Sequence, residues 1–307
     1  MPSKRNDEQL FHNYFAEWME IYKQGAVRPI TYQKYLMTLR WLAELAPNLK
    51  ICELDKRSYQ SLINEYAKTH EKQTTTDFHH HLKSAILDAI DEGLLFSDPT
   101  RKVVIKGKTP VTKKPKFLSQ HELKSLVASL NLGNEPNWDW FILLIVKTGA
   151  RFSEALALTP SDFDGCKIKI TKTWNYKSAN GGFAETKNQS SKRTLQIDPI
   201  LCKRFAKITE GLPVDKPIFV KGRVFNSTVN NRLEALCKNA KVPVISIHSL
   251  RHSHASALIF AGVSIASIAK RLGHSSVTTT QETYLHIIQE LENQDNDKII
   301  QYLAALA

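Results

Sequence analysis

The stretch HSLRHSHASALIFAGVSIASIAKRLGHSSVTTTQETYLH, residues 248–286, joins three short motifs that decide how the chain is interpreted. It begins with H-x-x-R, formed by His248 and Arg251, continues to an L-G-H turn that ends in His274, and contains one tyrosine, Tyr284. Apolar residues between the motifs recur at helical spacing. The stretch therefore predicts helices whose ends and loops can bring these four side chains together.

Two further motifs lie upstream. TGARFSEALAL (148–158) contains Arg151, with Glu154 three residues later, and ETKNQSSKR (185–193) contains Lys187. Taken singly, each of these residues is most often a surface charge, and a lone tyrosine is most often a packed aromatic. The complete set in this order indicates a functional site. Lys177 and Lys192 lie in the same region and are alternatives to Lys187.

The pattern of residues 117–307 predicts helices around one small sheet. Ser119 and Glu122 have the spacing of a capping box, and NWDWFILLIVKTG (137–149) predicts a buried helix that Gly149 ends. Alternating residues in KIKITKTWNY, FAETKN and KRTLQI then predict a three-stranded antiparallel sheet with two hairpins. The remainder, from Ser227 onward, predicts mainly helices.

The first hundred residues predict a helical bundle. EQLFHNYFAEWMEIYKQ (8–24) and TYQKYLMTLRWLAELA (31–46) each form one apolar stripe, and two more helices are expected near 58–68 and 74–92. The predicted fold class is therefore mainly α with a small antiparallel β-sheet. It comprises a helical bundle in residues 1–100 and an α+β domain in residues 117–307.

Residues 101–116, RKVVIKGKTPVTKKPK, combine seven Lys/Arg with two prolines and no acid. This composition does not build a core, and its charges repel one another unless an anion lies against them. The segment is predicted to be an interdomain linker that contacts the DNA backbone, although a solvated tether is the alternative. The predicted contact residues are Lys106, Lys108, Lys113, Lys114 and Lys116.

The composition favours a polyanionic partner. The net charge is +12, with 16 Lys/Arg against 14 Asp/Glu up to residue 110 and 26 against 16 beyond it. Ribosomal or nucleoid binding would also require such charge. Four cysteines without C-x-x-C spacing predict buried thiols, and no signal peptide or membrane span is expected, which predicts a cytoplasmic protein. The run His79–His81 predicts a polar helix face, and no metal site is expected.

The candidate side chains suit strand transfer on DNA. Two arginines can stabilise the charge that develops on phosphate oxygens, and a lysine on a mobile hairpin can protonate the leaving 5′ oxygen. A tyrosine can attack phosphorus and later act as a leaving group, so that the strand can be rejoined. A nearby histidine can accept the phenol proton.

The segments ARFSEALALTPSDF, ETKNQSSKRTLQI and residues 248–286 resemble the catalytic boxes of tyrosine recombinases, the phage and mobile-element integrase family. The resemblance covers residues 117–286, and the N-terminal part resembles the family's core-binding domain. It implies that Arg151 and Arg251 hold the scissile phosphate and that Lys187 is the general acid. It further implies that His274 bonds a non-bridging oxygen.

The resemblance also implies that His248 accepts a proton or contacts the phosphate. Tyr284 would form a 3′-phosphotyrosyl link, Glu154 would orient a catalytic side chain, and no metal or other cofactor would be needed. The implied function is integration or excision of a mobile element. Alternatives are a chromosome or plasmid resolution recombinase, topoisomerase-like relaxation, and DNA binding without cleavage.

The expected partners are double-stranded recombination sites and other copies of the chain. In the family a terminal helix docks into the neighbouring subunit of a tetramer, and residues 287–307 contain a matching stripe at Ile299, Ile300, Leu303 and Leu306, although packing in cis is the alternative. An excision factor or DNA-bending protein is a possible further partner. The first helix begins close to Met1, which predicts recombination of simple sites or a chain cut from a longer protein.

Overall fold

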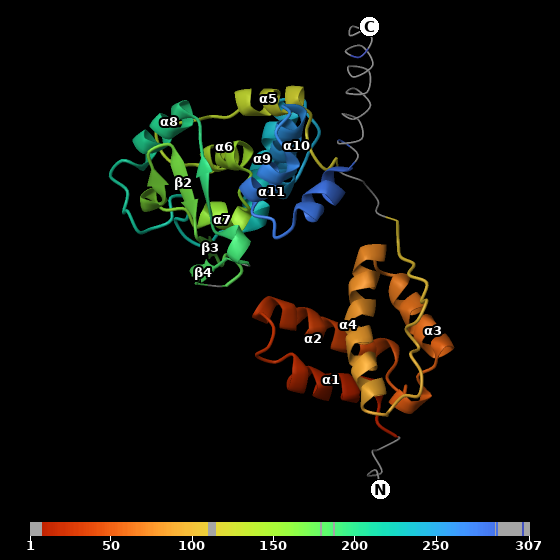
Figure 1. Cartoon of the computed structure of the whole chain (residues 1–307). Helices are drawn as coiled ribbons and strands as arrows, with labels where there is room; N and C mark the ends of the chain where they lie inside the picture. Colours follow the sequence, from red (N-terminus) through yellow and green to blue (C-terminus); the bar gives the residue numbers. More distant parts are fainter. Residues whose placement is uncertain are drawn as a thin grey trace. The chain divides into compact units, whose positions relative to one another are not determined.

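The computed structural model describes residues 8–109, 115–178, 180–186 and 188–285, together with Ile287 and Leu303. The chain divides into two compact units between residues 113 and 114. Figure 1 labels their helices and strands. Among the described residues, every helix is too short or too polar to cross a bilayer. The fold is mostly helical with small antiparallel sheets, so the predicted fold class is confirmed.

The N-terminal unit is a bundle of four α-helices. Their apolar stripes meet in one core that contains Phe15, Trp18, Tyr59 and Leu82. Burial of these faces stabilises the bundle because each aromatic removes a large apolar area from water. The indole of Trp18 keeps its polar atom satisfied by donating to Asp88 over 2.6 Å. The helices are α1 (Phe11–Tyr22), α2 (Pro29–Leu45), α3 (Lys56–Ala67) and α4 (Lys72–Asp91), with a 3₁₀ turn, η1 (Ile51–Glu53), before α3.

The first part of the predicted linker lies along this bundle. Val103 and Ile105 pack against its core, and the backbone of Val104 exchanges two hydrogen bonds of 2.9 Å with the Gln60 side chain. Lys108 N–H donates to His70 O over 2.8 Å. Residues 103–108 therefore belong to the N-terminal unit, and the apolar residues among the lysines explain why. The bounds of the linker beyond this contact stay a prediction.

The histidine run does not form the polar face that its sequence predicted. His79 is buried and its Nδ1 lies 2.8 Å from the Tyr59 hydroxyl, while His81 Nδ1 lies 2.8 Å from Thr38 Oγ1. Only His80 of the three is exposed. Helical spacing sends neighbouring residues in different directions, so the run is shared between core and surface.

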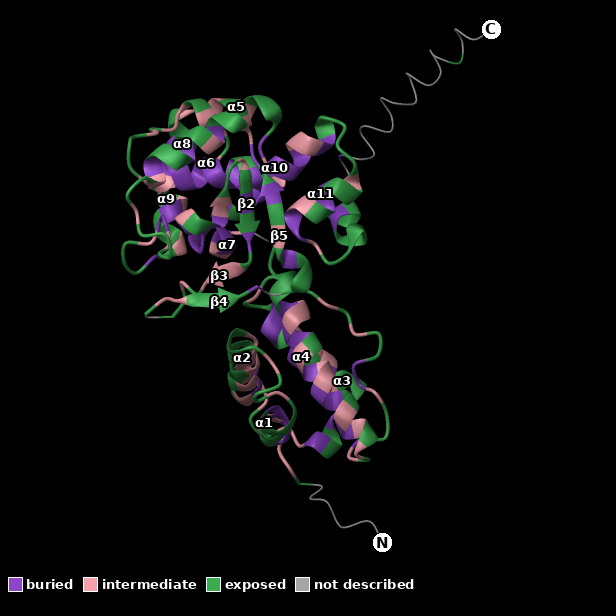
Figure 2. Ribbon diagram, turned by 60° about the vertical axis from the view of Figure 1, so that its left-hand side comes forward, coloured by how far each residue is buried: buried purple, intermediate pink, exposed green. Residues whose placement is uncertain are grey.

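The core of the C-terminal unit surrounds α6 (Trp138–Thr148). Nine of its residues are buried, and Figure 2 shows the helix in the buried colour along most of its length. A helix that is apolar on all sides needs neighbours on all sides. They include α5 (Gln120–Ala128), α7 (Phe152–Leu156), α8 (Pro199–Thr209), α9 (Asn226–Asn239) and α10 (Ile247–Phe260).

The predicted three-stranded sheet is split in two. The stretch 167–176 forms two strands, β2 (Lys167–Ile170) and β3 (Lys172–Trp174), which pair with different partners. The prediction of one sheet was wrong because the alternation continues across the break between β2 and β3. The larger sheet has the order β1-β2-β5, with β1 (Phe163–Asp164) and β5 (Arg193–Gln196), and the smaller one pairs β3 with β4 (Phe183–Glu185), all antiparallel.

A satellite cluster joins α10, α11 (Ile265–Leu272) and the helical residues 277–285. Ala255, Ile259, Ile268 and Leu272 pack there against Tyr284. The cluster fixes the helix that carries Tyr284 on the two helices that carry the H-x-x-R and L-G-H motifs. The three motifs of residues 248–286 are therefore positioned together by apolar packing.

Replacing Gly149 by alanine should destabilise the C-terminal unit by about 2–5 kcal/mol. Gly149 ends α6 with φ +66°, and a Cβ there would lie 2.6 Å from His254 Cδ2. The left-handed conformation costs a side chain about 1–2 kcal/mol, and the collision adds about 1–3 kcal/mol. Gly165→Ala is the matched control, because φ is +55° but the space is open. Equal shifts of the unfolding transition in calorimetry would contradict the collision.

Candidate active site

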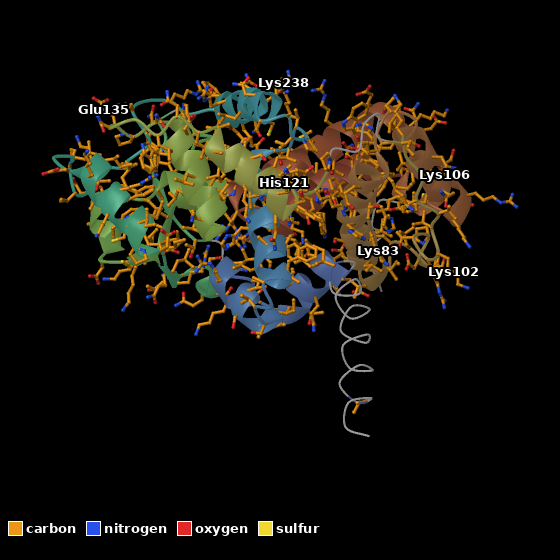
Figure 3. The ribbon with its side chains drawn as sticks, turned by 90° about the horizontal axis from the view of Figure 1, so that it is seen from above. Lys83, Lys102, Lys106, His121, Glu135 and Lys238 are labelled. Carbon is orange, nitrogen blue, oxygen red and sulfur yellow. The ribbon has the colours of Figure 1, made fainter. Side chains whose placement is uncertain are left out.

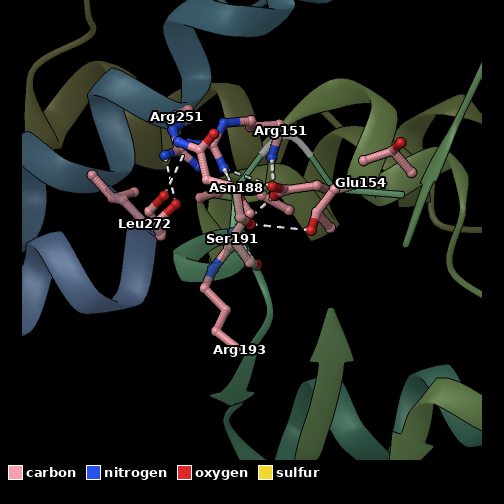
Figure 4. Close-up of polar contacts among 12 residues, drawn as sticks. Arg151, Glu154, Asn188, Ser191, Arg193, Arg251 and Leu272 are labelled. Carbon is pink, nitrogen blue, oxygen red and sulfur yellow. Dashed lines mark hydrogen bonds and ion pairs between the residues drawn. The ribbon is translucent and has the colours of Figure 1, made fainter. Parts of the chain in front are cut away.

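The C-terminal turn of α11 holds three arginines through three successive backbone carbonyls. Arg271 O accepts from Arg193 Nε over 2.6 Å, and Leu272 O accepts from Arg251 Nη2 over 2.6 Å. Gly273 O accepts from Arg151 Nη2 over 3.0 Å. The last carbonyls of a helix lack partners within the helix and carry its negative dipole end, so they suit guanidinium groups. Figure 4 shows Arg251 beside Leu272 and Arg151 beside Glu154.

Among the candidate cations that the structure describes, Arg251 is the most deeply buried, with 4% of its surface exposed. Its other guanidinium nitrogen donates to Gly149 O over 2.7 Å, so one side chain caps the ends of both α6 and α11. Burial, and then the nearby Arg151, lower the pKa of Arg251 to about 9. The protein partners of Arg251 do not neutralise its positive charge. This favours an anion as its further ligand.

Glu154 connects Arg151 to Arg193. Its two carboxylate oxygens lie 2.7 Å from Arg151 Nη1 and 2.9 Å from Arg193 Nη2, and the carboxylate also accepts from the Arg151 backbone N–H. Burial raises the pKa of Glu154, but the hydrogen bond and charge of Arg193 and the charge of Arg151 outweigh it, so the net pKa is lowered. The carboxylate stays ionised and fixes both guanidinium planes.

His274 follows the α11 turn and is anchored by the helix that carries the tyrosine. Its Nδ1 lies 2.7 Å from Thr280 Oγ1, and Thr280 is fully buried. Burial, and then Arg251 and Arg151, lower the pKa of His274 to about 4. The imidazole is therefore neutral near pH 7, and its second ring nitrogen remains as a donor for an oxygen ligand.

Tyr284 lies in the satellite cluster with 2% of its surface exposed. Its hydroxyl is 2.9 Å from His252 Nδ1. Burial raises the pKa of Tyr284 to about 12, although Arg251 acts in the opposite direction. The nucleophile candidate and the buried arginine are thus close enough to affect each other's charge within one chain.

Of the remaining candidates, His248 lies near the arginines: partial burial of its ring, and then Arg251 and Arg151, lower its pKa. His248 is exposed on the first turn of α10, and its ring centroid lies 5.2 Å from that of His252. Lys187 lies outside the described residues, between Thr186 and Asn188. Lys192, one of its alternatives, is exposed next to Ser191, and Lys177 is exposed in the β3–β4 hairpin.

The predicted DNA-contact lysines are described only in part. Lys106 and Lys108 are exposed on the segment that packs against the bundle, and Figure 3 shows Lys106 extending outward from this segment. Lys116 is exposed at the start of the C-terminal unit. Lys113 and Lys114 lie outside the described residues, as does most of the predicted tail helix.

The structure adds residues that the candidate set omitted. The Arg193 side chain is 6% exposed and joins β5 to Glu154 and to the α11 turn, and Ser191 Oγ accepts from Arg151 over 3.3 Å. Both stand in the motif TKNQSSKR, so the signal was present but was used only to select Lys187. From the sequence, His252 is interpreted as a capping or core histidine, because no spacing rule connects it with Tyr284.

Within the described ranges, no three histidine, cysteine, aspartate or glutamate side chains lie together in a manner that would hold a metal ion. The site instead gathers fixed guanidinium groups, neutral imidazoles and a phenol. Guanidinium forks match phosphate oxygens in geometry and charge, and a phenol can attack phosphorus. The arrangement therefore fits transfer of a phosphodiester to tyrosine.

Comparison with known sequences agrees with this chemistry. Residues 116–290 match the phage integrase family. The integrase of Staphylococcus phage L54a is 23% identical, and the match covers 94% of this chain and 92% of that protein. The ICEBs1 integrase of Bacillus subtilis (strain 168) is 30% identical over 70% of this chain and 62% of its own length. The chain therefore belongs to the phage integrase family of tyrosine recombinases, and the predicted resemblance is confirmed.

Solved structures support the two-unit fold. The Tn1549 transposon integrase in complex with transposon right end DNA aligns with a TM-score of 0.75 at 18% identity, over 90% of this chain and 95% of that one. A lambda integrase dimer bound to a core site aligns with a TM-score of 0.64 at 17% identity, over 87% and 96%. Because the sequence identities are this low, these alignments support a shared fold alone.

Glu154→Gln should destabilise the C-terminal unit by about 3–5 kcal/mol, because the change leaves two arginines without their shared carboxylate. Glu122→Gln is the control, since Glu122 is half-buried and only completes a capping box. The Glu122→Gln variant should lose about 1 kcal/mol of stability or less. Calorimetric unfolding of both variants at pH 7 measures the difference, and similar losses would contradict the bridging role of Glu154.

The same carboxylate predicts a pH dependence. The pKa of Glu154 is lowered in the folded chain, so its stabilisation is complete above the unfolded pKa of about 4.3 and is lost as the pH falls through the folded value. Glu154→Gln should therefore lose less stability than the wild type when the pH is lowered from 5 into that range. An unchanged pH profile in urea unfolding would contradict this assignment.

Proposed function

We propose that this chain is a site-specific integrase that cuts and rejoins DNA strands through a 3′-phosphotyrosyl intermediate, for integration or excision of a mobile element. The main support for this proposal is the position of Arg151 and Arg251, which successive carbonyls of one turn hold next to His274. Tyr284 packs on the same helices. Binding alone would not require a tyrosine in this position. The integrase relatives support the same activity.

In the proposed reaction the scissile phosphate binds between Arg151 and Arg251. His274 donates to a non-bridging oxygen through the nitrogen that does not contact Thr280. Tyr284 Oη attacks phosphorus and the bond to the 5′ oxygen breaks, which leaves the 3′ phosphate on the tyrosine. Because the arginines are already oriented, little reorganisation is needed when charge develops on the phosphate oxygens.

The leaving 5′ oxygen needs a proton, and we assign its delivery to Lys187 on the segment that follows β4. His248, exposed on the first turn of α10, is assigned to a phosphate oxygen. Strand rejoining reverses the steps, with a 5′ hydroxyl attacking the phosphotyrosine and the phenol leaving. These residues supply a charge clamp, an acid and a nucleophile, so the proposed cycle requires no metal.

The approach of DNA is favoured by a basic cavity beside the α11 turn. The cavity has a volume of about 600 Å³. Its basic and imidazole lining residues are Lys192, Arg193, Lys270, Arg271 and His274. With the excess charge of the second half of the chain, this surface suits a DNA backbone.

Recombination joins two sites, so we propose that four copies assemble on DNA through the predicted tail helix, in the cytoplasm where the DNA lies. An excision factor or DNA-bending protein would set the direction. Resolution of chromosomes or plasmids is the second candidate function, because the same site would serve it. Topoisomerase-like relaxation differs in needing one duplex only.

Covalent capture tests the proposal. The protein is mixed with fragmented genomic DNA from its source, denatured with SDS, and the attached DNA is sequenced. We expect recurrent cut positions and a 3′ link to Tyr284. Native binding without any covalent product would overturn strand cleavage and leave a DNA-binding protein.

Tyr284→Phe should abolish the covalent product and leave duplex binding within about twofold, because only the hydroxyl is removed and the ring still fills the satellite cluster. Gel shift and SDS capture on one DNA separate the two effects. His252 loses its phenol partner in this variant, so the unfolding temperature is measured in parallel. A covalent product that persists would place the nucleophile elsewhere.

Removing Lys106 and Lys108 together should weaken binding to any duplex and lower the salt slope by about 2, since each phosphate contact contributes about 0.9. Lys68→Ala is the control, because Lys68 is exposed but already paired with Glu65 at 2.6 Å. Binding titrations between low and moderate salt measure the slope. An equal slope in all three proteins would contradict the predicted contacts.

A further inference from the structure

The resting contact of the nucleophile is with His252. His252 and His248 lie four residues apart on α10 and therefore share one face of the helix. His252 Nδ1 is 2.9 Å from Tyr284 Oη, and the two ring centroids lie 5.9 Å apart. His248 is one turn closer to the start of α10, and its ring meets the edge of His252. His252 is thus the imidazole that touches the reacting oxygen.

Burial keeps both partners of this pair neutral at rest, and neighbouring cations add to the effect at His252. Burial, and then His248, Arg251 and Lys116, lower the pKa of His252 to about 4. Burial raises the pKa of Tyr284 to about 12. A neutral phenol has one proton to donate and a neutral imidazole has one bare nitrogen to accept it.

We propose that His252, rather than His248, accepts the phenol proton of Tyr284 during strand cleavage. The assignment rests on the proposed function and fixes the resting tautomer, with the proton of His252 on Nε2 and a bare Nδ1. As Oη bonds to phosphorus, the O–H bond breaks and its proton passes to Nδ1. The bond from phosphorus to the 5′ oxygen breaks, and that oxygen takes its proton from the general acid. Rejoining returns the proton from His252 to the leaving phenol.

The transfer is unfavourable before DNA binds and becomes favourable in the reaction. The bound phosphate brings negative charge beside Arg251 and His274, and this charge favours a protonated His252. The phenol proton grows more acidic as the bond to phosphorus forms, so the base acts in the transition state and not on the free phenol. A neutral acceptor at rest also avoids adding a fourth cation to the arginine cluster.

The kinetic test uses a captured target site and single-turnover formation of the covalent product. His252→Ala should slow this step by about 100-fold or more, as expected for loss of a general base. His248→Ala on the same helix face is the comparison variant, and it should also slow the step because His248 is assigned to a phosphate oxygen. If the wild type forms no covalent product, the proposed function fails. If the wild type reacts and His252→Ala reacts equally fast, only the present inference fails.

A slow His252→Ala variant could also reflect a misplaced helix, so a second arm changes the phenol alone. Difluorotyrosine, whose phenol is more acidic, is introduced at position 284 by itself, with His252→Ala and with His248→Ala. A more acidic phenol needs its base less, so the His252→Ala defect should shrink to about tenfold or less. The His248→Ala defect should keep its size. If difluorotyrosine reduced the rate defect of His248→Ala and left that of His252→Ala unchanged, the base would be His248 and the inference would be overturned.

The tautomer is tested in the whole protein without DNA. Nitrogen NMR of labelled histidines should report an unprotonated Nδ1 at His252, assigned by comparison with His252→Ala. Tyr284→Phe should shift this resonance, because the phenol proton donated to Nδ1 is removed. A protonated Nδ1 in the wild type would make the imidazole the donor and would overturn the assignment.

Discussion

Three carbonyls in a row at the end of α11 are the constraint on which the site depends. Arg271 O, Leu272 O and Gly273 O each hold a guanidinium group, and the three arginines come from β5, α10 and the start of α7. Gly273 makes this turn possible, because φ is +70° and a Cβ would lie 2.9 Å from Arg193 Nη1. The L-G-H motif therefore does more than present a histidine. It supplies the negative end of a helix as a common anchor for cations that would otherwise repel one another.

The anchor leaves the site short of negative charge. Glu154 is the carboxylate that pairs with Arg151 and Arg193, whereas Arg251 is held by carbonyl dipoles and its pKa is lowered to about 9. The arginines of such a site repel one another until an anion binds. The packed core around α6 holds them in place against this repulsion. Burial, and then the nearby positive charge, keep His274 and His252 neutral. Phosphate binding would thus relieve the repulsion and prepare the imidazoles to carry protons.

The sequence predicted the fold class and the family because both depend on local patterns. Apolar periodicity marked the helices, and the order of Arg151, Arg251, His274 and Tyr284 marked the candidate site. Three features escaped prediction for a physical reason. The stretch 167–176 was treated as one strand although its two halves pair with different partners, which is set by tertiary contacts. The basic composition of residues 103–108 predicts a linker, although Val103 and Ile105 among the lysines pack against the core of the bundle. The His252–Tyr284 bond joins residues 32 positions apart, and helix packing alone brings them together.

The helix of residues 277–285 connects the proposed phosphate site to Tyr284, the proposed nucleophile. Thr280 on this helix holds His274, and Tyr284, four residues later and so on the same face, holds His252. Any displacement that exposes the buried Tyr284 must therefore also act on the ring of His274. Conversely, in the proposed reaction a phosphate bound to His274 would restrain the helix that carries Tyr284. Because both histidines are neutral, neither bond is an ion pair that would lock the helix in place. In the proposed reaction these two neutral bonds would let Tyr284 respond to an occupied phosphate site, while the α11 turn holds the arginines.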